Sequence, residues 1–185
     1  MTDFVQAYPQ GVIVAMDQMS LYFQATVTRV WSPIGQTPVI RISPQRDHLH
    51  FYGALEVRLG REFAVTTAEQ TTEVTADFVR LLLLLYPTLP ILLLLDRAPW
   101  HHGPALTEVL DENPRLELIY FPPACPDLNP QEHVWERARD AISHNHTYPV
   151  FEQLISDFED YLNETLFESD FMEQYAPPID TAIFE

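Results

Sequence analysis

Three carboxylates are placed where they could support metal-dependent chemistry on phosphodiesters. Asp17 and Asp96 each follow a short apolar run, and Glu132 lies near the start of a predicted helix. Phosphoryl transfer with two metal ions needs hard oxygen ligands held close together, and carboxylates suit Mg²⁺ or Mn²⁺. Aspartates that follow strands and a glutamate on a helix would offer such ligands from rigid positions. The three acids are therefore predicted to form one metal site.

Each of these acids also has an ordinary structural explanation. An Asp after an apolar strand is commonly a turn former or a helix cap. Asn129 and Glu132 are spaced as a capping box, in which the glutamate reaches back to the cap residue. Taken singly, the residues leave the structural and the functional interpretations open.

The elements that must position these acids are predicted from apolar runs and turn residues. We expect strands at 11–16, 21–31, 48–58, 91–95 and 116–121, with shorter pieces at 39–42 and 62–66. We expect helices at 71–86, 104–112, 130–144 and 150–167. This order predicts an α/β fold, a mixed sheet with helices on its faces. Residues past the carboxyl ends of parallel neighbouring strands line a common crevice, where Asp17 and Asp96 would meet.

Two sequence motifs together resemble the signature of a known family. The stretch 96–101 reads Asp-Arg-Ala-Pro-Trp-His, and the stretch 126–132 reads Pro-Asp-Leu-Asn-Pro-Gln-Glu. They resemble the paired motifs of mariner-like bacterial insertion-sequence transposases, which belong to the DDE superfamily. The second and third acids are 36 positions apart, within the family's narrow range, and Trp135 fills the family's aromatic position. The resemblance extends over roughly residues 12–161.

The resemblance implies a ribonuclease H-like fold and a DNA transposase activity, with strand cleavage and strand transfer at transposon ends. It makes Asp17, Asp96 and Glu132 the catalytic residues and the ligands of Mg²⁺ or Mn²⁺, with two ions expected. The implied organisation is an N-terminal stub at 1–10, a catalytic domain at 11–168 and an acidic tail at 169–185.

The resemblance also places His101, Arg97 and Asn129 next to the predicted ligands or the substrate. Asn129 is in addition the predicted cap of the helix that begins at Pro130. The sequence departs from the family at Gln18, where many relatives have Glu, and at Arg97, where Asn is usual. Arg97 could instead pair with a carboxylate or contact a phosphate.

The charge of the chain bears on its partners. The net charge is −17, all ten cations are arginines, and residues 151–185 carry ten acids without Lys or Arg. Affinity for DNA comes from cations that neutralise phosphates, so this chain is expected to bind DNA poorly by itself. Family members usually carry N-terminal helix-turn-helix modules. We therefore expect binding of transposon ends and target DNA through a separate or missing module, and a homodimer in the active assembly.

Two further interpretations stay open at the level of sequence. The acid-rich 151–185 segment favours an inactive or repurposed transposase remnant that works by protein interaction. A ribonuclease H-like nuclease acting on other nucleic acids is the third possibility, although the 126–132 motif argues against it. The intact Asp17, Asp96 and Glu132 argue against decay.

The expected location is the cytoplasm, with no membrane span. The chain has one cysteine, Cys125, so no internal disulfide can form. Its apolar runs are too short to cross a bilayer, and its first residues lack the pattern of a signal peptide.

Overall fold

The computed structural model describes residues 1–40, 44–123 and 125–175. A five-stranded sheet forms its centre, in the order β3-β2-β1-β4-β5. The strands are β1 (Val12–Tyr22), β2 (His48–Glu56), β3 (Arg61–Thr67), β4 (Ile91–Leu95) and β5 (Leu116–Tyr120). The α-helices are α1 (Thr2–Ala7), α2 (Thr72–Leu85), α3 (Pro104–Glu112), α4 (Pro130–Ala138), α5 (Phe151–Glu164) and α6 (Phe171–Tyr175). Short helical turns are η1 (Pro99–His101), η2 (Pro126–Leu128) and η3 (Arg139–Ser143), of which η3 is a π-turn.

The sheet is mixed, as predicted. β1 pairs antiparallel with β2, and β2 pairs antiparallel with β3. β4 lies on the other side of β1, and both the β1–β4 and β4–β5 pairings are parallel. The prediction that the strands carrying Asp17 and preceding Asp96 are parallel neighbours is therefore confirmed.

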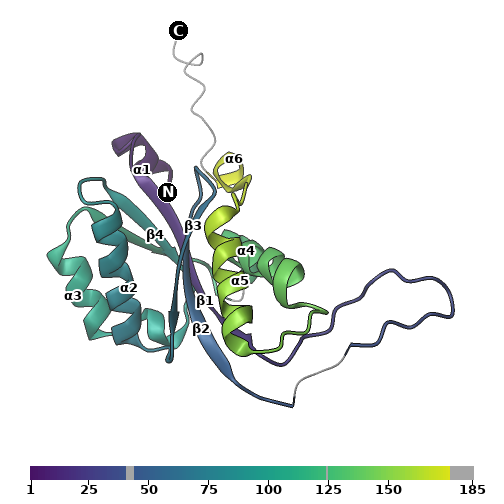
Figure 1. Cartoon of the computed structure of the whole chain (residues 1–185). Helices are drawn as coiled ribbons and strands as arrows, with labels where there is room; N and C mark the ends of the chain where they lie inside the picture. The colour runs from purple at the N-terminus through teal and green to yellow at the C-terminus, as the bar shows by residue number, and fades with distance from the viewer. Residues whose placement is uncertain (41–43, 124, 176–185) are drawn as a thin grey trace, which may run out of the picture.

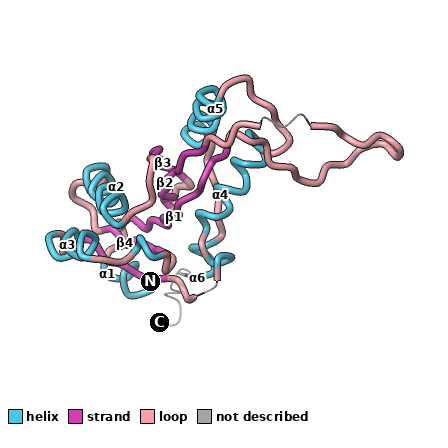
Figure 2. The backbone as a smooth tube through the Cα atoms, turned by 90° about the horizontal axis from the view of Figure 1, so that it is seen from below, coloured by secondary structure: helices cyan, strands magenta, loops and turns pink. Residues whose placement is uncertain are grey.

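Helices cover both faces of the sheet, α2 and α3 on one side and α4 and α5 on the other (Figure 1, Figure 2). Side chains alternate along β1, so its residues contribute to two cores. Val14 and Met16 pack in the core with α2 and α3, whereas Ile13 and Ala15 pack in the core with α4 and α5. By the same alternation Asp17 belongs to the α4 and α5 side.

The predicted β-α-β crossovers through α2 and α3 are present. Ile91–Leu95 is apolar throughout and buried, as expected of a central strand covered on both faces. Thr71 caps α2 by accepting a hydrogen bond from the backbone N–H of Val74. At the other end of α2, the Arg115 guanidinium donates to the carbonyls of Leu83, Tyr86 and Leu89 at 2.6–2.9 Å. These bonds satisfy free carbonyls at the helix end and fix β5 against it.

The prediction of a second strand at 21–31 is wrong. β1 continues without interruption through Asp17 to Tyr22, and 23–40 contains no strand. Pairing with β2 explains the longer strand, since Gln18 lies opposite Tyr52 and Tyr22 opposite His48. The segment after β1 projects from the body as a long arm (Figure 1). The piece expected at 39–42 lies partly outside the described residues, and its described part is not a strand.

Smaller corrections concern the helices and the ends. The helix predicted at 130–144 is α4 followed by the π-turn η3, and the helix predicted at 150–167 ends at Glu164. The stub expected at 1–10 contains α1, whose Phe4 is buried. Part of the expected tail forms α6, while 176–185 lies outside the described residues. No helix in the described part of the chain is long and apolar enough to cross a membrane.

Candidate active site

Asp17 and Asp96 are brought level by the parallel pairing of β1 and β4. Ala15 lies beside Leu94, so two further residues along each chain reach Asp17 and Asp96. β4 ends at Leu95, but β1 continues, which corrects the expectation that both acids follow strand ends. Asp17 is a mid-strand residue that lies where its neighbouring strand stops. At the predicted crevice, therefore, only β4 ends, while β1 runs on past it.

The Asp17 carboxylate is buried, with 8% of the residue exposed. Burial raises the pKa of Asp17 to about 8, and the negative charges of Glu132 and Asp96 contribute to this increase. The backbone N–H of Gln18 and the Trp135 indole act in the opposite direction. The indole nitrogen of Trp135 nevertheless makes no hydrogen bond of good geometry to any described residue. A carboxylate in this setting favours a proton or a bound cation as neutralising partner.

Asp96 has the opposite environment. Its side chain is 49% exposed, and its Oδ1 lies 2.5 Å from Nδ1 of the fully buried His101. The same oxygen accepts a hydrogen bond from the backbone N–H of Ala98 at 2.9 Å. The hydrogen bond with His101 is the main cause that lowers the pKa of Asp96 below its ordinary value. Asp96 is therefore held as a charged carboxylate.

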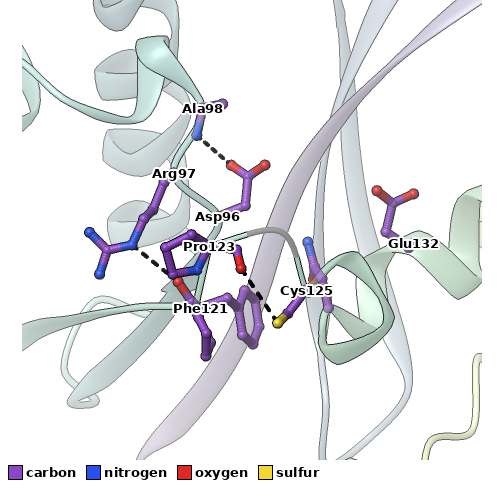
Figure 3. A pocket seen from close by; sticks show the side chains of 9 residues that line it. Asp96, Arg97, Ala98, Phe121, Pro123, Cys125 and Glu132 are labelled. Carbon is purple, nitrogen blue, oxygen red and sulfur yellow. Dashed lines mark hydrogen bonds between the residues drawn. The ribbon is translucent and has the colours of Figure 1, made fainter.

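Glu132 projects from the first turn of α4. The predicted cap is confirmed: Asn129 Oδ1 accepts from the backbone N–H of Gln131 at 3.2 Å, and Pro130 takes the first helical position. The helix start places the exposed Glu132 carboxylate beside a pocket of about 380 Å³, which Asp96 also lines. Figure 3 shows Asp96 and Glu132 on opposite sides of this pocket.

The three acids come from three different elements and interact electrostatically, because Asp96 and Glu132 both act on the pKa of Asp17. They do not form a closed ligand group. No three His, Cys, Asp or Glu side chains among the described residues are arranged to hold a metal ion.

Arg97 lines the same pocket as Asp96 and Glu132. Its Nε donates to the Phe121 carbonyl at 3.3 Å, and its guanidinium lies 5.5 Å from the centre of the Tyr120 ring. In the described part of the chain it forms no ion pair with a carboxylate. Both roles predicted for Arg97 therefore stay predictions.

Several residues next to these acids were not singled out from the sequence for a role at the site. Gln18 Oε1 accepts from the Trp100 indole N–H at 2.5 Å and lies 2.8 Å from His101 Nε2. On the face of the sheet that carries Asp17, opposite to the face of Gln18, Glu62 contacts Gln131. Trp100 and Gln131 lie within the two motifs, so their positions were a usable signal. Glu62 is one acid among 27 and nothing in its local sequence marks it.

Comparison with known proteins places this site in a family. The sequence model of the DDE superfamily endonucleases matches residues 12–155, which include all three acids. The chain belongs to this family. The predicted kinship with mariner-like insertion-sequence transposases is thereby supported at the level of the whole domain.

Individual relatives agree with this assignment. The DDE domain is 26% identical over 143 residues to the "Insertion element IS630 uncharacterized 39 kDa protein" of Shigella sonnei, covering 75% of this chain and 41% of the relative. Among solved structures, it resembles the Mos1 transposase paired-end complex with left transposon end, with a TM-score of 0.67 and 16% identity. It also resembles the Mos1 mariner paired end complex with Mn, with a TM-score of 0.64 and 15% identity. Both structural matches cover 90% of this chain and 52% of the Mos1 chain.

The DDE domain thus has the fold of a transposase catalytic domain, and the predicted ribonuclease H-like class is confirmed. It spans less than half of the insertion-element relative and about half of the Mos1 chains.

Proposed function

We propose that this DDE domain cleaves DNA strands at transposon ends and transfers them to target DNA, with divalent metal ions held by Asp17, Asp96 and Glu132. The observation that carries the proposal is that Asp96, after β4, and Glu132, on α4, line one pocket and both act on the pKa of Asp17 on β1. The pKa of Asp17, raised to about 8 by burial and by the other two acids, reflects this concentration of negative charge. Family membership and the transposon-end DNA in the similar Mos1 complex support the substrate.

The donor set fits Mg²⁺ or Mn²⁺. All three side chains offer hard carboxylate oxygens, and the region lacks the Cys and His spacing of a zinc site. Manganese in the similar Mos1 structure agrees with this choice. Two ions would bind, of which one activates the attacking oxygen and the other stabilises the leaving oxygen.

The residues of the chain would contribute position and charge. Asp17 must release its proton for the site to fill, whereas Asp96 is already ionised through His101 and Ala98. Both bonds of Asp96 use Oδ1, so Oδ2 is the oxygen suited to a metal ion. Arg97, in the same pocket, would contact a phosphate oxygen of the DNA.

The reaction would proceed in two balanced steps. Water attacks a phosphodiester at the transposon end, which breaks the P–O3′ bond and frees a 3′-hydroxyl group. This hydroxyl then attacks a phosphodiester of the target DNA, forming one P–O bond and breaking another. The two steps use the same carboxylates, since both are in-line displacements at phosphorus.

Recognition of the DNA ends would come from a helix-turn-helix module outside these 185 residues, in a homodimeric assembly. The net charge of −17, without any lysine, leaves few cations for phosphate contacts. The ten acids of 151–185 favour a second candidate, a repurposed domain that works by protein interaction.

Single replacements Asp17→Asn, Asp96→Asn and Glu132→Gln test the proposal. We expect each to reduce Mn²⁺-dependent nicking of plasmid DNA by about a thousand-fold, because a ligand that supplies several kcal/mol of charge stabilisation is lost. Each should also weaken Mn²⁺ binding measured by calorimetry. Glu56→Gln is the matched control, since Glu56 is a buried acid on the other side of the sheet, next to Tyr86. A wild-type domain that binds no Mn²⁺ would instead favour the repurposed domain.

A further inference from the structure

A partly buried polar contact lies near Asp17, between the sheet and the start of α4. Glu62 of β3 and Gln131 of α4 meet there at 2.8 Å, between Glu62 Oε1 and Gln131 Nε2. We propose that Glu62 and Gln131 form a brace that positions Glu132 relative to Asp17 for metal binding. The inference rests on the proposed function, because it concerns the same metal site.

The contacts tie three elements together. Glu62 Oε1 also accepts a hydrogen bond from the backbone N–H of Ala54 on β2, at 3.1 Å. One carboxylate oxygen thus joins β3 to β2 and to α4. Gln131 has no exposed surface and directly precedes Glu132 in the chain. The brace therefore fixes the backbone at the position from which Glu132 projects.

The close approach of α4 to the sheet depends on Gly53. Gly53 lies opposite Asp17 in the β1–β2 pairing. A Cβ atom at Gly53 would overlap with the Trp135 ring, with Glu62 Oε1 and with Gln131 Nε2. The missing side chain thus leaves room for the brace beside Asp17.

Stability alone does not explain a carboxylate at this position. Burial raises the pKa of Glu62 well above its ordinary value, and the nearby charge of Asp17 adds to the increase. Glu62 Oε2 and Gln131 Oε1 are both buried without a hydrogen-bond partner among the described residues. Buried, incompletely satisfied polar groups are costly, and apolar replacements of similar volume are often at least as stable. A role in positioning the neighbouring ligand accounts for their presence.

The brace has a particular value for Glu132. Asp17 is fixed by strand pairing and Asp96 by His101, but Glu132 is exposed and has a long side chain. Its reach toward Asp17 is set by where the first turn of α4 lies. Groups that hold metal ligands in place typically contribute ten- to hundred-fold to metal affinity.

Replacement of Glu62 in the intact chain tests the proposal, with Mn²⁺ affinity measured by calorimetry and folding followed by thermal unfolding. Glu62→Ala removes the acceptor and should weaken Mn²⁺ binding about tenfold. Glu62→Gln keeps an acceptor oxygen and should stay within about threefold of wild type. Glu56→Ala is the matched control, because it removes a buried Glu whose partner, Tyr86, is remote from α4. It should change the unfolding temperature without changing Mn²⁺ affinity.

A double-mutant cycle gives a second measurement. Gln131→Ala should weaken Mn²⁺ binding as Glu62→Ala does, and the double variant should be no weaker than either single variant. Additive losses would overturn the brace, because independent residues add their effects. Unchanged affinity in a folded Glu62→Ala protein, or an equal loss in Glu56→Ala, would also overturn it.

The outcome separates this inference from the proposed function. If wild type binds no Mn²⁺, or if Asp17→Asn leaves binding unchanged, the metal site itself is wrong. If binding depends on Asp17 but not on Glu62, the metal site stands and the brace is wrong. Gly53→Ala is a further, steric test of the brace. Its Cβ atom should displace Gln131 and weaken Mn²⁺ binding at least as much as Glu62→Ala does.

Discussion

Asp17 and Asp96 lie side by side, yet the protein treats their charges in opposite ways. Asp17 is enclosed by the sheet and α4, pairs with no cation among the described residues, and has a pKa of about 8. Asp96 is half exposed, and His101 and the Ala98 N–H lower its pKa. The protein itself therefore keeps Asp96 ionised, whereas the negative charge of Asp17 is left for a bound cation to stabilise. Metal binding should therefore depend on pH because of Asp17. It should also depend on the hydrogen bonds that hold Asp96.

The largest expected consequence is a pH dependence of metal binding. Below pH 8 a proton must leave Asp17 before a cation can take its place, so affinity should rise tenfold per pH unit. Between pH 6 and pH 8 we expect Mn²⁺ affinity to increase about 50-fold, because half of Asp17 is ionised at pH 8. Calorimetry in buffers of different ionisation enthalpy measures both the affinity and the proton released.

The comparison of the two acids breaks down if Mn²⁺ affinity is the same at pH 6 and pH 8. Asp17→Asn provides the control, because its residual binding should lose this pH dependence.

The metal-free protein should show opposite stability effects at the two acids. Folded Asp17 keeps a proton that the unfolded chain releases above about pH 4, so the free energy of unfolding falls as pH rises toward 8. Asp17→Asn should therefore increase the free energy of unfolding at pH 8 by about 1–3 kcal/mol, and by less at pH 5. Asp96→Asn should decrease it by about 1 kcal/mol, since a partly exposed charged hydrogen bond is lost.

Urea unfolding at pH 5 and pH 8, without metal, measures these differences. If both variants change the free energy of unfolding in the same direction, then Asp17 and Asp96 do not have the opposite environments described above. Added Mn²⁺ should stabilise wild type more than either variant, because wild type binds it more tightly.

His101 is expected to support the Asp96 side alone. His101→Ala removes the partner that lowers the pKa of Asp96, so Mn²⁺ affinity should fall about tenfold. The pH dependence that comes from Asp17 should persist in this variant. His102→Ala is the matched control, since His102 is exposed and makes no hydrogen bond to Asp96 among the described residues; its ring contacts the Tyr120 ring, with 4.7 Å between the ring centres. Equal losses in both variants would mean that Asp96 does not depend on His101.

Most of the framework could be predicted from the sequence. Apolar runs such as 91–95 specified buried strands, and Asn129 with Pro130 specified a helix start, because local chemistry determines both. The two motifs specified which acids belong together. Asp96 and Glu132 line one pocket and both act on the pKa of Asp17, while the convergence of the three acids on a metal ion stays a prediction.

The rest depended on contacts between distant residues. Asp17 and Gln18 look like the end of a strand, but pairing with β2 carries the strand on to Tyr22. The stretch 21–31 has a strand-like composition, yet both sides of β1 are already occupied by β2 and β4. Val27 and Trp31 consequently lie exposed in the connection. The different environments of Asp17 and Asp96 likewise arise from burial and from His101, which the sequence alone does not reveal.

Replacement of Gln18 should have the smallest effect on Mn²⁺ affinity. It tests whether β1 helps to orient Asp96 through His101. Its Oε1 accepts from the Trp100 indole and faces His101 Nε2, while its own Nε2 is buried without a partner among the described residues. Gln18→Leu leaves the Trp100 N–H without its acceptor and removes the polar contact with His101, which should lower stability by about 1 kcal/mol. Mn²⁺ affinity should fall only about threefold, because His101 still contacts Asp96 directly. Gln18→Glu keeps an acceptor oxygen for the Trp100 N–H and should retain more of the Mn²⁺ affinity than Gln18→Leu. If the two variants bind Mn²⁺ equally well, then Asp96 is oriented by His101 and Ala98 without help from β1.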